Sequence, residues 1–385
     1  MEMQRFVSSH KAQTIPEKFK ELPFVSGILG YCSYPLGEHI HKLPVRIKHN
    51  SDIHFPDVFL GSYSWSYVFD RQQDKGWLTF SPECNTELRR LILSEIERAQ
   101  KSPVDLMPAN SSFPWTKSQD YTSYAQAFTA LQDYIFSGDC YQANLTQRFE
   151  CDLASRATPF SAILYYLEQQ QKLETPYSAF ISFAADQKLI CFSPEQFIQI
   201  KERIIESKPI KGTIANTDDP ENIGRLRASV KNQAENVMIV DLLRNDLSKV
   251  CEVNSVHVPE LFKIESFQNV HHMVSHIRGK LREGISEFDA FLSCFPGGSI
   301  TGAPKLRAME IIRELETHSR NAYCGSVFFW NDNGNFDSNI LIRSIIQSGE
   351  KLYCWAGGGI VADSEVKDEY QESLTKVSNL TGITD

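Results

Sequence analysis

Apolar residues in the first third of the chain occur in short runs that turn-forming residues interrupt. Runs rich in aromatic and β-branched side chains lie at residues 24–31, 57–70 and 76–80, separated by Gly, Pro, Asn and Asp. Such runs are typical of strands in a sheet. Leucine and isoleucine recur through the charged stretch 82–102, which predicts a helix after these strands.

From residue 121 onwards the pattern alternates between helical and strand spacing. Large apolar residues recur at helical spacing in residues 121–137, and Gly138 follows where such a helix would end. The same patterns predict a strand at 141–149, a helix at 160–171 and a strand pair at 179–183 and 189–192. Interleaved strands and helices indicate sheets that are covered by helices.

A further helix, residues 230–247, combines apolar runs with charged residues. The apolar residues leave little of its surface for solvent, so we expect Asp241, Arg244 and Asp246 to form a buried, hydrogen-bonded network. Glu235 lies just before the apolar run. Its position is equally typical of a surface carboxylate and of a functional one.

The C-terminal helix, residues 366–380, has two distinct stripes. Glu369, Glu372 and Lys376 cluster about 100° away from the apolar stripe, so two carboxylates share one edge of the buried face. One interpretation is a solvated flank with an ordinary i, i+4 Glu–Lys pair. The other is a pair of carboxylates beside a cleft, which would bind a divalent cation.

Composition narrows the class of protein. The 385 residues are 42% hydrophobic and 23% charged, which is typical of a globular chain and excludes a disordered or fibrous one. The net charge of -9 provides no positive field for nucleic acid, so no such partner is expected. The chain has neither a run of eighteen apolar residues nor a basic start followed by an apolar block. We therefore expect no membrane segment, no export signal and a cytoplasmic location.

The nine cysteines exclude two common kinds of site. No two of them lie two to four residues apart, so neither a zinc pair nor a thioredoxin-type pair is present. None lies in the Gly-x-Cys-x-Gly sequence that carries a glutaminase nucleophile. Reduced and mostly buried thiols are expected, as in a cytosolic protein.

Glycines and charges gather in a few otherwise apolar segments. Residues 297–305 lack the Gly-Lys-Ser/Thr ending of a phosphate-binding loop, and the glycines at 357–359 lack the later glycine of a dinucleotide fingerprint. The segments follow one another as Ser193-Pro-Glu, Pro209-Ile-Lys-Gly-Thr, Glu235-Asn-Val-Met, His271-His-Met, Gly298-Ser-Ile-Thr-Gly-Ala-Pro-Lys, Tyr323-Cys-Gly, Ile342-Arg, Gly357-Gly-Gly-Ile and Glu369-Tyr-Gln-Glu.

In this order the segments resemble those of the chorismate-utilising enzymes. The family includes anthranilate synthase component I, isochorismate and salicylate synthases, and aminodeoxychorismate synthase component I. The strong match covers residues 119–380, and the N-terminal third fits loosely. Anthranilate synthases typically carry Ala between Pro-Ile and Gly-Thr, whereas aminodeoxychorismate synthases carry Lys. This chain has Lys211 and resembles the second branch.

The resemblance implies an α+β fold. Large, mainly antiparallel β-sheets would pack as a sandwich flanked by helices, with the active-site cleft between two lobes. It also implies a division into an N-terminal part of the fold, residues 1–117, and a chorismate-binding catalytic region, residues 118–385.

The resemblance further implies a binding site for Mg²⁺ and the chorismate dianion. Glu235 and Glu372 would be direct metal ligands, with Glu369 nearby. Relatives often carry an acid at the position of Asn232, which brings no charge here. Because the protein itself has a net negative charge, binding must come from the metal and from local donors. The implied substrate-binding residues are Gly212, Thr213, Thr301, Tyr323, Arg343, Gly357, Gly359 and Lys376.

For catalysis, the resemblance implies three residues. Lys211 would add to C2 of chorismate while the C4 hydroxyl leaves, and ammonia would then resolve the adduct at C4. Glu195 would act as the general acid for the poor leaving group, and His272 would steady the hydroxyl or the ring. Taken alone, these residues are more typical of a solvated loop lysine, a turn carboxylate and a buried core histidine than of catalytic groups.

The expected function is amination of chorismate at C4. Because the chain lacks a glutaminase nucleophile, the expected ammonia source is a separate glutamine amidotransferase subunit. Two alternatives stay open at this point. One is anthranilate synthase component I, which aminates C2. The other is a catalytically silent protein that only binds chorismate or an amino acid.

Overall fold

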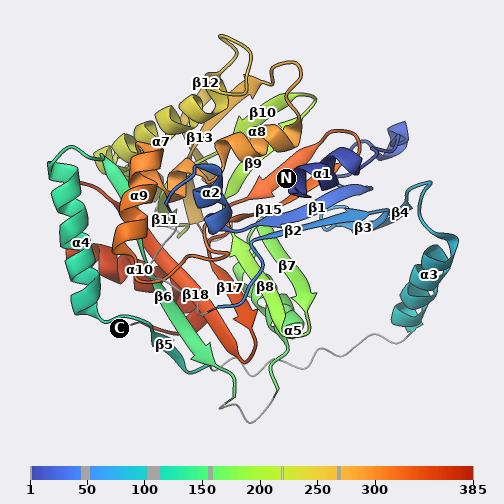
Figure 1. Ribbon diagram of the computed structural model, residues 1–385, viewed down its shortest axis with the longest axis horizontal. Helices are drawn as coiled ribbons and strands as arrows, with labels where there is room; N and C mark the ends of the chain where they lie inside the picture. Colours follow the sequence, from blue (N-terminus) through green and yellow to red (C-terminus); the bar gives the residue numbers. More distant parts are fainter. Residues whose placement is uncertain are drawn as a thin grey trace.

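In the computed structural model of the protein, strands lie in the interior and helices surround them (Figure 1). The described residues are 2–44, 53–101, 113–154, 159–217, 219, 221–266 and 270–384. Their strands form sheets of nine, seven and two members, and the strand pairs within them are antiparallel.

The nine-stranded sheet joins segments that lie far apart in the sequence. Its order is β11 (Ile210–Ala215), β13 (Val270–Lys280), β10 (Ile204–Ser207), β9 (Gln196–Lys201), β16 (Phe336–Asn339), β15 (Ser326–Asn331), β1 (Gly27–Cys32) and β2 (Val58–Tyr63), with β12 (His257–Ser266) paired to β13. The predicted strand at 24–31 and the first part of the run at 57–70, which is β2, therefore belong to a sheet that also contains strands from the C-terminal half.

The seven-stranded sheet forms the second layer. Its order is β14 (Gly302–Ala303), β6 (Gln142–Asp152), β18 (Lys351–Ile360), β17 (Ser344–Ser348), β8 (Gln187–Ser193) and β7 (Tyr177–Ala184), with β5 (Trp115–Lys117) paired to β6. In its centre, Gly357–Gly359 of β18 pair with Asn144–Thr146 of β6. The small third sheet is the hairpin of β3 (Trp65–Asp70) and β4 (Lys75–Phe80).

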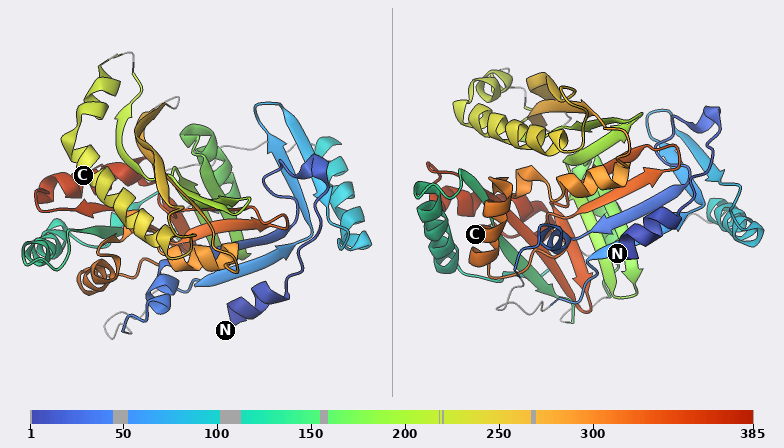
Figure 2. Two further views of the ribbon diagram at one scale, coloured as in Figure 1. Left: turned by 90° about the horizontal axis from the view of Figure 1, so that it is seen from above. Right: turned by 45° about the horizontal axis from the view of Figure 1, so that its top comes forward.

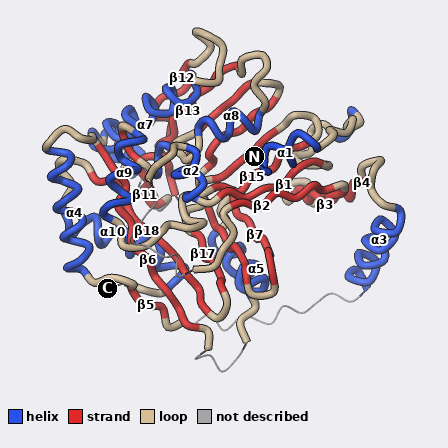
Figure 3. Tube along the Cα trace, viewed as in Figure 1, coloured by secondary structure: helices blue, strands red, loops and turns tan. Residues whose placement is uncertain are grey.

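Helices cover both large sheets, as Figures 1 and 3 show. Against β6 and β18 lie α4 (Tyr121–Phe136), α9 (Lys305–Leu315) and α10 (Val366–Thr381), while α5 (Ala162–Leu173) packs on β7 and β8. Against β11 and β13 lie α6 (Asn222–Ala228) and α7 (Val230–Ser248), and α8 (Glu287–Cys294) contacts α7. The remaining helices are α1 (Glu2–Ser9), α2 (Tyr34–Ile40) and α3 (Thr86–Lys101), and α3 lies at the end of the molecule that the hairpin occupies (Figure 2).

Buried apolar side chains fill the spaces between these layers. The largest cluster joins β1, β9 and β10 to α7 and α8, a second lies under α5 and the C-terminal part of α10, and a third lies between α4, α9 and the pair β6 and β18. The predicted α+β class with large antiparallel sheets and flanking helices is confirmed. The predicted division at residue 117 stays a prediction.

Most predicted elements are confirmed, including the helices at 121–137, 160–171, 230–247 and 366–380. One prediction on α7 is wrong, because Asp241 and Arg244 lie on its exposed side and pair only with each other, at 2.9 Å. Only Asp246 is buried. All nine cysteines are free and all but Cys84 are buried, as expected. Across the described ranges, no helix is both long and apolar enough to span a bilayer.

Candidate functional site

A cavity of about 580 Å³ brings residues of both large sheets together. One wall comes from β11, β13 and α7, and the opposite wall comes from β18 and α10. Every site residue named from the sequence lines this cavity except Thr301. The volume is typical of small-molecule sites.

Lys211 lies on a bulge of β11. The pairing of β11 with β13 shifts register between Ile210 and Thr213, and Gly212 has a positive φ of 86° that favours glycine. Lys211 is half-buried, and its ammonium group has no hydrogen bond or ion pair with another described residue. The bulge thus places at the cavity wall an amine that forms no hydrogen bond or ion pair with the described residues.

Glu195 follows β8 and lines the same cavity. Its backbone is fixed, because Glu195 N donates to the Ser193 hydroxyl at 3.1 Å and Ile340 N donates to Glu195 O at 3.1 Å. Burial raises the pKa of Glu195, and the charge of Lys211, among smaller effects, offsets this only in part. The carboxyl therefore keeps its proton to higher pH than an ordinary glutamate, as a general acid requires.

His272 is a neutral group in this site. A hydrogen bond of 2.8 Å joins its Nδ1 to the Thr213 hydroxyl, between the paired strands β13 and β11. Burial, with a smaller contribution from the Arg343 charge, lowers the pKa of His272. The ring is therefore uncharged at pH 7 and orients polar groups rather than supplying a cation.

Two carboxylates of α10 converge beside Gly358. A Cβ added to this glycine would lie 2.8 Å from Glu369 Oε2 and 3.7 Å from Glu372 Oε1, so only glycine leaves the space open. Burial raises the pKa of Glu369, with Ser364 opposing and Glu372 adding to the shift. Burial is the largest single effect on Glu372 and acts to raise its pKa, but the Lys376 ammonium at 2.6 Å, together with Lys231 and Lys211, outweighs burial, so the pKa of Glu372 is lowered.

These residues fit Mg²⁺, although no described cluster of three His, Cys, Asp or Glu side chains forms a ready metal site. Glu369 and Glu372 share one spot on α10, and Glu235 of α7 lines the same cavity. Mg²⁺ is usually held by one or two carboxylates, water and an anionic substrate rather than by a complete protein cage. The Asn232 amide lies against Gly212 and adds no charge.

Arg343 offers a cationic group on the same cavity. Its guanidinium forms no hydrogen bond or ion pair with any described residue, although burial already lowers its pKa. A half-buried guanidinium without an acidic partner is ready to bind a carboxylate. Tyr323 and Trp355 stack nearby with their rings 6.4 Å apart, which gives the cavity an aromatic wall.

The glycines at 357–359 are not turn residues. They lie within β18, where the backbone itself forms part of the cavity wall. Lys376 crosses from α10 to this strand and donates to Gly357 O at 2.9 Å. The lysine is therefore part of the site and not only a surface partner of Glu372.

Several residues that line the cavity were not predicted from the sequence, and one predicted residue, Thr301, does not line it. Thr301 is fully buried outside the cavity lining, and its hydroxyl donates to Gly297 O at 2.9 Å. Residues that line the cavity but were not predicted include Asn144, Lys231, Ser299 and Trp355. Lys231 lies one helical turn before Glu235 and Ser299 lies two residues before Thr301, so proximity to known motifs was an available signal.

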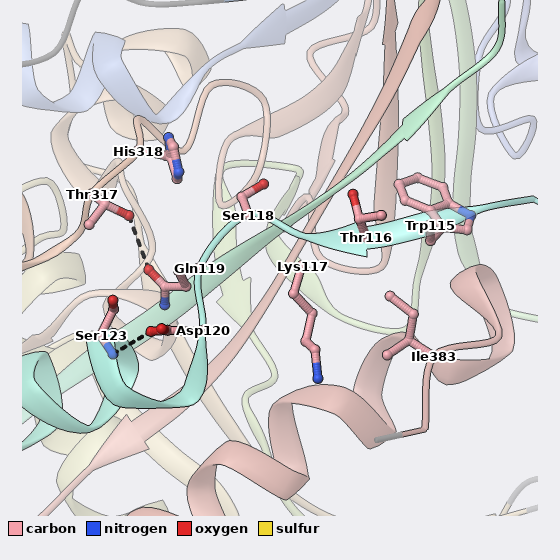
Figure 4. Close-up of a pocket in the computed structure, with 10 residues that line it drawn as sticks. All are labelled: Trp115, Thr116, Lys117, Ser118, Gln119, Asp120, Ser123, Thr317, His318 and Ile383. Carbon is pink, nitrogen blue, oxygen red and sulfur yellow. Dashed lines mark hydrogen bonds between the residues drawn. The ribbon is translucent and has the colours of Figure 1, made fainter. Parts of the chain in front are cut away.

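A second cavity, of about 740 Å³, lies on the surface where β5 meets the start of α4 and the loop after α9 (Figure 4). Asp120 accepts a hydrogen bond of 2.8 Å from Ser123 N, so the N-terminus of α4 is capped by its own carboxylate. Thr317 donates to Gln119 at 3.0 Å across the opening. Its lining lacks the combination of an amine, an acid and paired carboxylates that the first cavity has.

Comparisons with known proteins identify a family and related proteins. Residues 2–382 match the family described as chorismate binding enzyme. Aminodeoxychorismate synthase component 1 of Klebsiella aerogenes is 41% identical over 369 residues, 95% of this chain and 78% of that protein. The protein of the same name from Escherichia coli (strain K12) is 40% identical over 374 residues, 96% of this chain and 79% of that protein. The crystal structure of anthranilate synthase component I from Streptococcus pneumoniae TIGR4 matches with a TM-score of 0.85 and 28% identity, over 98% of this chain and 85% of that one.

Proposed function

Because the chain belongs to the family of chorismate binding enzymes, we propose that it aminates chorismate at C4 to form 4-amino-4-deoxychorismate for 4-aminobenzoate and folate biosynthesis. The observation that carries this choice is Lys211, which lines the cavity on a bulge and has no partner among the described residues. The relatives from Klebsiella aerogenes and Escherichia coli, named aminodeoxychorismate synthase component 1, support it.

In the first step, the neutral amine of Lys211 attacks C2 of the ring. Both conjugated ring double bonds shift, the bond from C4 to its hydroxyl breaks, and Glu195 donates the proton with which the hydroxyl leaves as water. The raised pKa of Glu195 supports this role, because the acid must still be protonated when the reaction starts. Glu195 ends the step as a carboxylate.

In the second step, ammonia attacks C4 and the bond between C2 and Lys211 breaks. A proton from the incoming ammonia returns to Glu195, and the free lysine amine is restored. Two allylic displacements place nitrogen on C4, which a single attack at C2 would not do. The net reaction consumes chorismate and ammonia and releases the amino product and water.

Substrate binding would use the remaining charges of the cavity. Mg²⁺ bound by Glu235 and Glu372, with Glu369 nearby, would neutralise the ring carboxylate. Arg343 and Tyr323 would hold the second carboxylate together with the backbone of Gly357 and its neighbours. Support for this arrangement is that the acidic and cationic groups line one cavity and that Arg343 pairs with no acidic group in the described part of the chain.

Ammonia would come from a glutamine amidotransferase subunit, and the location would be the cytoplasm. The name "component 1" of the relatives supports a second component, and the absence of a Gly-x-Cys-x-Gly segment supports a separate glutaminase chain. The proposal therefore includes a complex of two polypeptides.

Product identification tests the proposal directly. The purified chain is supplied with chorismate, Mg²⁺ and ammonium, and the product is identified by mass and fluorescence. We expect 4-amino-4-deoxychorismate. Fluorescent anthranilate as the main product would instead identify 2-amination, and chorismate that binds in calorimetry but is never consumed would identify a silent binding protein.

A further inference from the structure

The carboxyl of Glu195 is held by a side chain that the mechanism above does not use. Ser299 Oγ donates a hydrogen bond of 2.8 Å to Oε1 of Glu195, and both residues are buried. Oε2 of Glu195 has no hydrogen-bond partner in the described part of the chain, and the residue lines the cavity. We propose that Ser299 is a positioning residue that fixes Oε1, so that Oε2 presents the transferable proton to the C4 hydroxyl.

Hydrogen bonds to the residues before and after Ser299 hold the turn that carries it. Ser299 is the middle residue of the short 3₁₀ helix η2. On its C-terminal side, the Thr301 hydroxyl donates back to Gly297 O at 2.9 Å. Arg320 NH1 donates to Ile300 O at 2.8 Å. These contacts hold the backbone around Ser299 while leaving its hydroxyl free to bond Glu195.

A buried lysine ties the same loop to the rest of the fold. Lys305 Nζ donates to the carbonyls of Cys294 and Pro296, each at 2.8 Å, and to Asp246 Oδ2 at 2.6 Å. Three acceptors match the three protons of an ammonium group. Since Asp246 belongs to α7, the loop that positions Ser299 is anchored to the helix that also carries Glu235.

The hydrogen bond has an electrostatic consequence besides a geometric one. A hydroxyl that donates to a carboxylate stabilises the ionised form. Burial raises the pKa of Glu195, and Ser299 is one of the groups that limit this rise. Loss of the hydroxyl would therefore raise the pKa further and release the carboxyl from its orientation. The inference rests on the proposed function of Glu195 as the acid.

The test compares Ser299→Ala, Ser299→Thr and the wild type through the pH dependence of kcat/KM for chorismate, at a fixed concentration of free ammonia. We expect Ser299→Ala to lower the maximal kcat/KM by about 10-fold to 100-fold. The basic limb of the pH profile, where the acid loses its proton, should move to higher pH. Ser299→Thr keeps the hydroxyl and should restore both. Ser293→Ala, the same change at an exposed serine of α8, should alter neither.

Glu195→Gln separates failure of this inference from failure of the proposed function. If Glu195→Gln retains the wild-type rate and basic limb, the assignment of the acid is wrong. If Glu195→Gln removes the limb but Ser299→Ala keeps the wild-type limb, Ser299 is only structural and the inference is overturned. In the Glu195→Gln background, Ser299→Ala should cost nothing further, because a positioning residue acts through the group that it positions. A further loss there would also count against the inference.

Discussion

Glu195 is a buried residue, and burial raises the pKa of its carboxyl. Between the ordinary pKa of an unfolded glutamate and the raised value in the fold, the unfolded chain is ionised while the folded chain keeps the proton. The free energy of unfolding therefore falls as pH rises through this window. We predict that Glu195→Gln, which preserves shape but does not titrate, is more stable than the wild type at pH 8 by on the order of 1 kcal/mol. Urea unfolding should show no such gain at pH 4, and equal gains at both pH values would contradict the raised pKa.

Lys211 is the residue on which the position of amination depends. Lys211→Ala removes the amine that would occupy C2, so formation of 4-amino-4-deoxychorismate should fall by about 10³-fold or more. The open C2 position would then admit a small flux to anthranilate. Calorimetry should still detect Mg²⁺-dependent chorismate binding, because Glu235 and Glu372 are unchanged. Lys201→Ala, at an exposed lysine at the end of β9, serves as the control. A normal rate of 4-amination in Lys211→Ala would rule out the covalent adduct.

Glu372 is a site carboxylate whose ionised form is favoured, since the nearby lysines outweigh burial and lower its pKa, whereas the pKa values of Glu195 and Glu369 are raised. Glu372→Gln keeps the shape but removes the charge that would bind the metal. We expect Mg²⁺ affinity in the presence of chorismate to fall on the order of 100-fold, with turnover falling in parallel. Titration calorimetry with Mg²⁺ measures this. Asp368→Asn, an exposed change on the same helix, should bind Mg²⁺ normally, and normal binding by Glu372→Gln would exclude it as a ligand.

At the scale of elements, α7 carries ion pairs in contrasting surroundings. Asp246 is buried and pairs with Lys305 at 2.6 Å and with the half-exposed Lys249 at 2.9 Å, whereas Asp241 and Arg244 pair at the exposed surface. Lys305→Met leaves a buried carboxylate and two carbonyls without this donor, so the free energy of unfolding should fall by about 3 kcal/mol. Arg244→Ala should change it by less than about 0.5 kcal/mol. Urea unfolding of both variants measures these changes. Equal losses of unfolding free energy would mean that the buried Lys305 ion pair stabilises the fold no more than the exposed pair does.

The same helix shows where sequence patterns predict well and where they fail. Its length and start were predictable from helical spacing, and the structure confirms them. The prediction that Asp241 and Arg244 are buried failed because the apolar residues were counted without being assigned to faces of the helix. Val237 is 42% exposed, so the buried stripe is narrower than the apolar content indicates and both charges lie beside it.

The bulge in β11 was beyond the reach of spacing arguments. The register shift of β11 appears only against β13, which lies some sixty residues later in the chain. The glycines of β18 present the same difficulty. Their sequence is typical of a turn, and only the pairing with β6 makes them a wall of the cavity. Lys211 and Gly357 could therefore be named from the resemblance but not placed.

At the scale of the whole molecule, the cavity exists only because distant strands share two sheets. β1 pairs with β15 across about three hundred residues, and the cavity lining runs from Asn144 to Val377. Periodicity predicts individual elements, but it contains no information about which of them pair. The ordered motifs indicated a family, and the family's fold indicated which strands pair. The site residues could therefore be expected to lie together, and all except Thr301 line one cavity.

The last prediction concerns the assembly to which this chain would belong. None of its nine cysteines lies in a glutaminase sequence, and all but Cys84 are buried, where burial raises the pKa of thiols such as Cys294 to about 12. Such thiols are poor nucleophiles, so the chain alone should not release ammonia from glutamine. We expect the purified chain to consume chorismate with ammonium salts, and with glutamine only after a glutamine amidotransferase subunit is added. A matched reaction with an amidotransferase whose nucleophilic cysteine is replaced by alanine should support the ammonium reaction alone. Glutamine-dependent turnover by the single chain would overturn the two-polypeptide proposal and would locate the glutaminase within these 385 residues.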